Sequence, residues 1–205
     1  MTLVITPARA EEHQPAARLL ADTMAGFGVA VLGVGDEALE LRALSHWFQQ
    51  QGNRFSHQYA HLARWQGEVA GLLLCFAGSD AEKLSLNCRH GMAQLYTVGQ
   101  LATLIWRGMV LGKTREAEKD EFLVAHMAVF EQYQRKGIAS ALLEKAVMLA
   151  REQQFKRVVL EVEIGNLPAI KCYQKFGFHT QFTTKFGRYA SLLQCPGYHK
   201  MVLEL

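Results

Sequence analysis

The segment from residue 122 to residue 178 constrains the fold more than any other part of the chain, because buried strands alternate with helices along it. It opens with "FLVAHMAVF" (122–130), a nearly all-apolar run that is typical of a strand buried on both faces. An amphipathic pattern over 138–153 predicts a helix, with a polar stripe along one side. "KRVVLEVEI" (156–164) is rich in β-branched residues and predicts a second strand. A short helix is expected over 167–177, so this segment indicates an α/β fold.

The first half of the chain predicts three strands and two helices. In order, we expect a strand over 2–6, a helix over 7–24, an uncharged glycine-rich loop over 26–35, a helix over 36–52, and two strands joined at Gln66-Gly67. Alternation along the first strand of that hairpin places His57, Tyr59 and His61 on one face. Those two histidines have no acidic or cysteine partner nearby, so we expect no metal site.

Residues 79–120 interrupt this pattern between the third and fourth predicted strands. Their middle is apolar and predicts helix, whereas the end, "KTREAEKDE" (113–121), predicts a solvated loop. Two closing strands are expected, over 178–186 and 198–205. Together the elements predict a mixed α/β sheet in a single domain over 1–205, since that length suits one core.

Charge and composition exclude several classes of protein. The net charge is +3 and its cations are interleaved with acids, so nothing in the pattern demands a nucleic-acid partner. The longest uncharged stretch, 91–106, is too short and too polar to span a bilayer. The four cysteines form no C-x-x-C pair and the opening has no basic leader, so we expect reduced thiols in a cytoplasmic protein.

The turn before the helix over 138–153 has the properties of an anion site. A strand that leads through a glycine turn into a helix gathers unpaired backbone N–H groups at the positive end of the helix dipole. Gly137 lets an anion approach, Ala139 keeps the next contact open, and Arg135 and Lys136 add full positive charges. A pyrophosphate fits these properties, and the alternative is a surface turn capped by two basic residues.

Two blocks of sequence resemble the GCN5-related N-acetyltransferase (GNAT) superfamily. "VFEQYQRKGIASALL" is similar to its acetyl-CoA-binding motif, Q/R-x-x-G-x-G/A, with Gln134, Gly137 and Ala139 in place. "LEVEIGNLPAIKCYQKFGF" resembles the next block of the superfamily. The positions that match there are Leu160, Val162, Asn166, Ala169, Tyr173, Gly177 and Phe178. The resemblance is strong over 122–178, the expected acetyl-CoA-binding core, and earlier residues match only in the order of elements.

The resemblance implies a mostly antiparallel central sheet flanked by helices, with 79–120 as a helical insertion. It also implies direct transfer of acetyl from acetyl-CoA, as co-substrate, to a primary amine of a small molecule, protein or peptide. The residues that it assigns to acetyl-CoA are Met127, Ala128, Val129, Gln134, Arg135, Lys136, Gly137, Ile138, Ala139, Ser140, Asn166, Ala169 and Tyr173.

Three side chains are candidates for proton transfer. The resemblance implies that Tyr173 protonates the departing CoA sulfur, although a tyrosine packed in the core would also fit. It also suggests Glu161 as the base, and partial burial would raise the pKa of this carboxyl to a useful value. His126 stays in reserve, because alternation turns it to the opposite face unless a bulge intervenes. The base is therefore Glu161, His126 or water.

The expected function is an acetyl-CoA-dependent N-acetyltransferase, and the resemblance also suggests a homodimer. The alternative is a catalytically inactive CoA-binding sensor or interaction module that has the same fold. The acceptor amine is not identified by the sequence, because the insertion departs from the superfamily pattern. Its apolar residues, Leu101, Leu104, Ile105 and Trp106, could roof the amine site, contact a second subunit or pack within the monomer.

Overall fold

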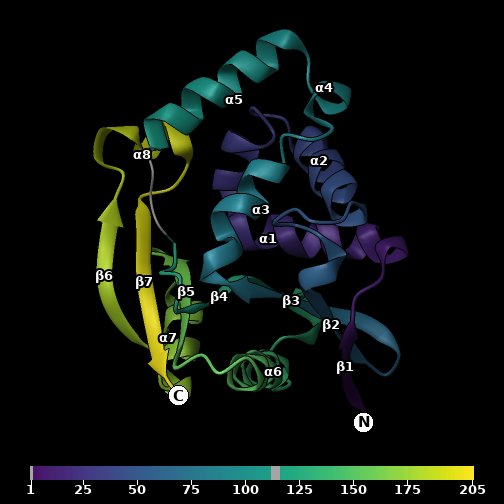
Figure 1. The fold of residues 1–205 in the computed structure, drawn as a ribbon, viewed down its shortest axis with the longest axis vertical. Helices are drawn as coiled ribbons and strands as arrows, with labels where there is room; N and C mark the ends of the chain where they lie inside the picture. The colour runs from purple at the N-terminus through teal and green to yellow at the C-terminus, as the bar shows by residue number, and fades with distance from the viewer. Residues whose placement is uncertain (1, 112–115) are drawn as a thin grey trace.

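The computed structural model describes residues 2–111 and 116–205, and they form a seven-stranded sheet with helices on both faces (Figure 1). The strand order is β1-β2-β3-β4-β5-β7-β6. The strands are β1 (Leu3–Pro7), β2 (Ala60–Trp65), β3 (Glu68–Ala77), β4 (Phe122–Val129), β5 (Arg157–Glu163), β6 (His179–Lys185) and β7 (Gly197–Glu204). β4 and β5 run parallel, and the other neighbours are antiparallel. The predicted mixed, mostly antiparallel sheet is confirmed.

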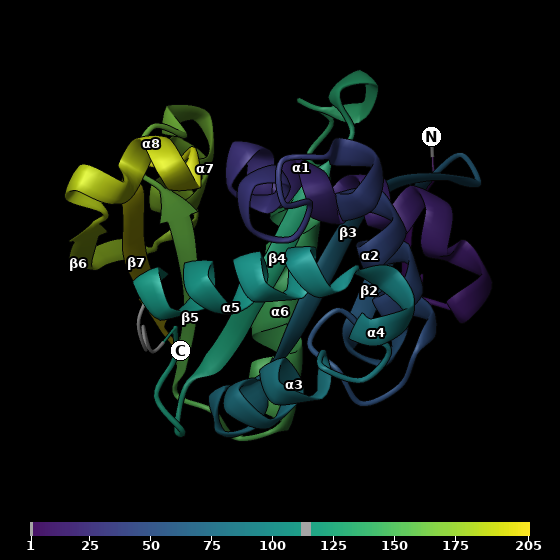
Figure 2. The same cartoon turned by 90° about the horizontal axis from the view of Figure 1, so that it is seen from above.

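Each face of the sheet carries its own helices. α1 (His13–Val31) and α2 (Glu37–Gln49) cover one face, which we call the α1 face. α6 (Ile138–Glu152) and α7 (Leu167–Phe176) cover the other, which we call the α6 face. Between β3 and β4 lie α3 (Ala81–Asn87), α4 (Met92–Leu95) and α5 (Val98–Leu111), which confirms that the interruption is helical. A short α8 (Ala190–Leu193) precedes β7. Seen from above, α5 lies over α1 and the sheet (Figure 2).

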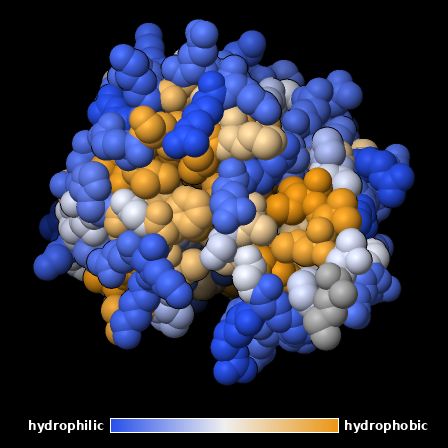
Figure 3. Space-filling model, turned by 90° about the horizontal axis from the view of Figure 1, so that it is seen from below, coloured by the Kyte–Doolittle hydropathy of each residue, from blue (hydrophilic) through white to orange (hydrophobic). Residues whose placement is uncertain are grey.

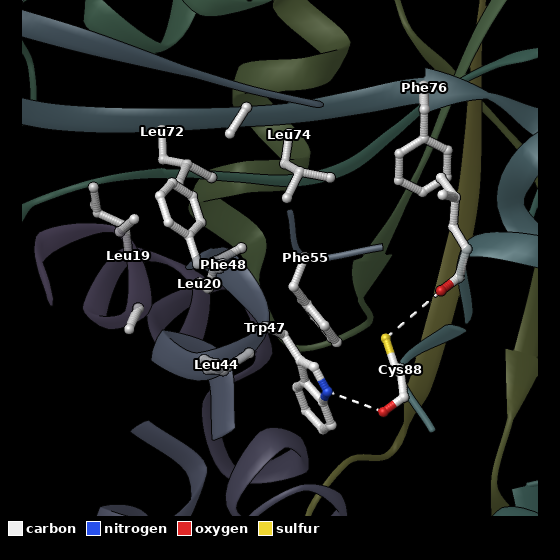
Figure 4. Close-up of a cluster of buried hydrophobic side chains, with 14 of the residues drawn as sticks. Leu19, Leu20, Leu44, Trp47, Phe48, Phe55, Leu72, Leu74, Phe76 and Cys88 are labelled. Atoms are coloured by element: carbon white, nitrogen blue, oxygen red, sulfur yellow. Dashed lines mark hydrogen bonds between the residues drawn. The ribbon is translucent and has the colours of Figure 1, made fainter. Parts of the chain in front are cut away.

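Two hydrophobic cores follow from this layering. On the α1 face, the leucines of α1 and β3 meet the aromatic side chains of α2 and of the segment before β2 (Figure 4). Trp47 is fully buried there, and its Nε1 donates to the backbone oxygen of Cys88 at 2.9 Å, which anchors α2 to the end of α3. On the α6 face, alternate residues of β4 and β5, including Val124 and Leu160, pack against Ile138 and Leu142 of α6. Because successive side chains of a strand point to opposite faces, each of these strands contributes side chains to both cores.

Gln66 and Gly67 form the turn between β2 and β3 as predicted. Both residues have positive φ, 54° and 91°, as a two-residue hairpin turn with the twist of its strands requires. The hairpin pairs Trp65 with Glu68. Its position matters for the site below, because Trp65 lies near the turn that precedes α6.

The prediction of a loop over 26–35 is wrong for its first half, because α1 continues to Val31 after a kink. Ala25 has φ 45° and ψ −135°, and the helix resumes beyond it. Gly28 is buried against Glu40 of α2, and a Cβ at this position would collide with that carboxyl group. The glycines here allow close helix packing rather than a loop. At the other end, α1 begins at His13 rather than Pro7, because Pro7 still pairs with His61 in the sheet.

The predicted solvated loop over 113–121 is also only partly right. Residues 113–115 lie outside the described residues, and Glu118, Lys119 and Asp120 are exposed. Ala117 and Glu121 are buried, and Glu116 forms an ion pair with Arg54. The density of charge is a poor guide here, because three of these acids, Glu116, Asp120 and Glu121, have basic partners elsewhere in the fold.

The outer surface shows apolar patches framed by polar side chains, as the underside of the molecule illustrates (Figure 3). One shallow groove there runs between α6, α7 and the end of β7, and Val147, Phe176 and Leu203 line it. Among the described residues, no helix has both the length and the apolar character that a bilayer crossing needs.

Candidate active site

The parallel strands β4 and β5 separate soon after they begin, and this opening is the centre of the candidate site. They pair only from Phe122 to Val124 on β4 and from Val158 to Leu160 on β5. Beyond these residues β4 continues beside β3 and β5 beside β7. We call the opening the fork. It leaves the β5-facing edge of residues 125–129 without a strand partner in the described part of the chain, so an extended ligand can pair with that edge.

α6 begins at the end of the fork, and its first turn is open to solvent. Gly137 is the N-cap, with φ 78°, and no side chain caps the helix. Gln134, Arg135, Lys136 and Gly137 are all exposed. The first backbone bond of the helix runs from the Ala141 N–H to the Gly137 oxygen, so the amides before it are free to bind an anion. A Cβ on Gly137 would meet no atom within 4 Å, so this position requires glycine for its φ rather than for space.

Lys136 is held on one side of this turn by two aromatic rings. Its Nζ lies 5.4 Å from the ring centre of Trp65 and 5.2 Å from that of Tyr133. Cation–π attraction of this kind orients an ammonium group without neutralising it. The turn therefore presents a full positive charge together with its amides.

Tyr173 lies on α7, on the α6 face of the sheet. Its side chain is 8% exposed and packs in the same cluster as Met127 and Ile138, with its ring 6.0 Å from that of Phe178. Burial raises the pKa of Tyr173 above its ordinary value, so the phenol carries its proton at neutral pH. A protonated phenol on this face of the sheet is suited to donate a proton to a departing thiolate.

Glu161 lies on the opposite face. It follows Leu160, the last β5 residue paired with β4, and alternation turns it to the α1 face together with Val159. Burial raises its pKa to about 7, and the negative charge of Glu116 adds to the shift. A carboxyl that titrates near neutrality can accept a proton from an amine.

His126 also points to the α1 face, because the pairing of β3 with β4 contains a bulge. The register shifts between Leu74 and Cys75, which pair with His126 and Val124, so β4 carries Ala125 as an extra residue. From the sequence alone, His126 is expected to face the other side of the sheet unless a bulge intervenes, and this bulge is present. Burial, assisted by the positive charge of Arg54, lowers the pKa of His126 to about 3. The buried ring is therefore neutral near pH 7 and is a weaker base than an exposed histidine, which favours Glu161 as the candidate base.

An ion pair that the sequence did not predict joins the insertion to this side of the site. Arg54 donates to both oxygens of Glu116, at 2.9 and 2.8 Å, and to Ser85 Oγ at 3.2 Å. Both charges act on Glu161 and on His126. The partners are 62 residues apart in the sequence, and no local pattern links them.

A second ion pair lies at the far side of Glu161. Lys200 on β7 lies opposite Glu161 in the register of β5 and β7. Its Nζ donates to Glu121 Oε2 at 2.7 Å. Their side chains are 3% and 1% exposed. Lys200 moderates the raised pKa of Glu161, because it favours the charged carboxylate.

The remaining predicted residues have clear local roles. Asn166 caps α7, with its Oδ1 accepting from the Ala169 N–H at 3.2 Å. His57 does not share a strand face with His61. It lies in a 3₁₀ turn (His57–Tyr59) and its Nδ1 is 2.8 Å from the Phe48 oxygen, whereas His61 is part of β2. Among the described residues, no three His, Cys, Asp or Glu side chains gather in a way that could hold a metal ion.

Comparison with known proteins decides the family. The model of the acetyltransferase (GNAT) family matches residues 32–178, more than half of the chain. The chain belongs to this family. The match covers the fork, the turn before α6, and both Glu161 and Tyr173.

Two relatives of known name match parts of the chain. GCN5-related N-acetyltransferase 4, chloroplastic, from Arabidopsis thaliana is 32% identical over 113 residues, which are 52% of this chain and 38% of that protein. An N-alpha-acetyltransferase from Sulfurisphaera tokodaii is 38% identical over 80 residues, or 38% of this chain and 40% of that protein. The matched regions thus span about two fifths of these relatives.

Solved structures share the fold over nearly the whole chain. An N-acetyltransferase from Staphylococcus aureus Mu50 superposes with a TM-score of 0.72 at 21% identity, covering 98% of this chain and 100% of that one. This similarity also covers the closing strands β6 and β7, which lie beyond the residues that the family model matches.

Proposed function

We propose that this protein transfers acetyl from acetyl-CoA to a primary amine of a small molecule, protein or peptide. One observation carries the proposal. The β4–β5 fork has free amides at the α6 turn beside it, a protonated phenol on one face and a carboxyl that titrates near pH 7 on the other. A thioester in the fork would therefore meet an acid and a base from opposite sides.

The proposed reaction proceeds without a covalent enzyme intermediate. Glu161 takes a proton from the ammonium group of the acceptor, and the amine nitrogen then attacks the thioester carbon. As the C–N bond forms and the C–S bond breaks, the sulfur takes a proton from Tyr173, and the surplus proton of the new amide nitrogen then returns to the tyrosinate. Glu161 releases its proton to solvent, which restores both groups. The pantetheine arm pairs with the free edge of Met127, Ala128 and Val129, and the amides from Arg135 to Ser140 hold the pyrophosphate.

The first acceptors to test are α-amino groups of peptides. The relative from Sulfurisphaera tokodaii is named an N-alpha-acetyltransferase, which supports this choice. Small amines form the second group, and release of the CoA thiol reports transfer to either. A protein that binds acetyl-CoA but releases no thiol with any amine would be the inactive sensor instead.

The cofactor half of the proposal is tested by calorimetric titration with CoA on two matched variants. Gly137 and Gly35 have φ of 78° and 96°, and a Cβ at either position would meet no atom within 4 Å. Alanine strains both positions by about 1–2 kcal/mol. Gly137→Ala should weaken CoA binding about tenfold because the strained turn holds the pyrophosphate, whereas Gly35→Ala should bind CoA like the wild type. Equal affinities for the two variants, or no CoA binding by the wild type, would refute the proposal.

The homodimer is a separate proposal. Exposed apolar side chains on α5, namely Val98, Ile105, Trp106 and Met109, support it. Light scattering should give a mass near twice that of one chain, and a single-chain mass would contradict it.

A further inference from the structure

The hydrogen bonds around Thr23 fix the protonation of His126. Thr23 Oγ1 donates to the backbone oxygen of Leu20 at 2.6 Å, and the same atom lies 2.7 Å from His126 Nδ1. A hydroxyl group has one proton, so the bond to Leu20 leaves Thr23 as the acceptor in the second contact. His126 Nδ1 must then carry the proton of the neutral ring. His126 Nε2 is left as a bare acceptor.

That acceptor has no donor among the described residues. His126 is 9% exposed, and its Nε2 is buried without a hydrogen-bond partner. Phe55 lies against the ring at 5.4 Å, and the terminal nitrogens of Arg54 are bonded to Glu116 and Ser85. A buried acceptor without a partner costs about 1–3 kcal/mol. The atom is therefore suited to a donor that arrives with a ligand.

The orphan atom lies in the same neighbourhood as the proposed base. His126 is two residues beyond the last β4 residue paired with β5, Glu161 is one residue beyond the last on β5, and both point to the α1 face. The charges of Arg54 and Glu116 act on both groups. A primary amine has more than one N–H, so it can give a proton to one group and a hydrogen bond to the other.

We propose that His126 Nε2 accepts a hydrogen bond from the incoming primary amine and so directs its lone pair toward the thioester, while Glu161 takes the proton. The inference rests on the proposed function and assigns His126 an orienting role rather than that of the base. Thr23 has a positioning role, since its hydroxyl keeps the proton of the ring on Nδ1.

Two substitutions test the roles of the two ring nitrogens of His126 separately. His126→Asn keeps an N–H at the position of Nδ1 for Thr23 but removes the acceptor at the position of Nε2. His126→Gln retains an acceptor at the Nε2 position and loses the contact with Thr23. With the best amine from the thiol-release screen, kcat/KM should fall about 100-fold in His126→Asn and recover to within about tenfold of wild type in His126→Gln. Equal losses in both variants would overturn the proposal.

The same variants guard against a merely structural effect. CoA affinity by calorimetry should be unchanged in both, because neither substitution touches the pyrophosphate turn. His126→Gln should also keep the rise of kcat/KM with pH near 7, since Glu161 and not His126 titrates there. Loss of that rise would assign the base role to His126 and refute the proposal.

A direct reading comes from ¹⁵N-histidine NMR of the full chain saturated with CoA, with n-butylamine and glycinamide as amine probes. His126 is assigned from the signals missing in His126→Gln. The proposal expects a proton on Nδ1 and a shift of the Nε2 signal when either amine is added. A proton on Nε2, or an Nε2 signal that no amine moves because a water molecule holds it, would overturn it. Amine-dependent shifts without any acetyl transfer would support the contact between His126 Nε2 and the amine, but they would refute the proposed enzyme and, with it, the orienting role.

Discussion

At the scale of single residues, burial acts in opposite directions on the two titratable groups at the fork. It disfavours the charged form of each, so the pKa of Glu161 rises to about 7 and that of His126 falls to about 3. Only the carboxyl then changes protonation near neutral pH. For this reason we propose Glu161 as the base, although an isolated histidine would titrate closer to neutrality.

Substitution of Glu161 should abolish the rise of kcat/KM with pH that is expected up to about pH 7. The carboxyl must be ionised to accept a proton, so wild-type kcat/KM should rise with pH and level off above about 7. Glu161→Gln should lower kcat/KM by about 100-fold or more and abolish that rise. The amine contributes its own titration at higher pH, which both proteins share. A variant that retains this rise near pH 7 would show that another group is the base.

The sequence could reveal the phosphate turn but not the direction of His126. The pattern around Gly137 is local, because one glycine and the start of a helix create the free amides. The bulge at Ala125 is not local, since it arises from how β4 pairs with β3, and neither Gly nor Pro marks it. The tautomer of His126 further depends on Thr23, which is 103 residues away in the sequence.

At the scale of elements, the close packing of α1 on α2 leaves a carboxyl group in an unfavourable place. Glu40 is 1% exposed, its Oε1 has no hydrogen-bond partner among the described residues, and it lies against Gly28. Burial raises its pKa to about 7, and the negative charges of Glu37 and Asp22 contribute. The native state therefore binds this proton more tightly than the unfolded chain does.

This shift gives a pH-dependent prediction for stability. Stability from the protonated form is fully present below about pH 4.5 and is lost as pH rises through about 7. Glu40→Gln removes the ionisable group, so the variant should be more stable than wild type by about 1–3 kcal/mol at pH 8 and equally stable at pH 4.5. Urea unfolding at the two pH values measures this. The same difference at both values would show that Glu40 does not titrate in the folded protein.

Strands and hairpins were readable from the sequence because their signals are short-ranged. Gln66-Gly67 marked the β2–β3 turn, and the apolar run at 122–130 marked β4. The helical conformation of residues 26–31 could not be predicted, because glycine has a low helix propensity. Here that propensity is overridden by packing, since a neighbouring side chain occupies the space where a Cβ would lie. That neighbour, Glu40, lies on a different helix.

At the scale of the whole molecule, one part-buried and one buried ion pair attach the end of the insertion to both halves of the sheet. Glu116 bonds to Arg54 before β2, and five residues later Glu121 bonds to Lys200 on β7. These contacts span the fork, so they hold the segment that leads into β4 against both halves of the site. Glu116 and Glu121 therefore have structural roles.

Breaking one of these pairs should cost stability that a second change restores. Lys200→Met leaves Glu121 buried without its closest cation and should lower the free energy of unfolding by about 3 kcal/mol. The double variant Lys200→Met/Glu121→Gln removes the stranded charge and should recover most of that loss. Chemical denaturation of the two variants measures the difference. A double variant that is no more stable than Lys200→Met would contradict the interaction between the two side chains.

The central claim is that the amides before α6 hold a diphosphate and thereby place a thioester in the fork. A crystal structure of the CoA complex tests it most directly. We expect the pyrophosphate against the backbone of residues 135–140 and the sulfur in the fork, with Tyr173 on one side and Glu161 on the other. CoA bound elsewhere, or a turn closed against its own side chains in the complex, would contradict the account.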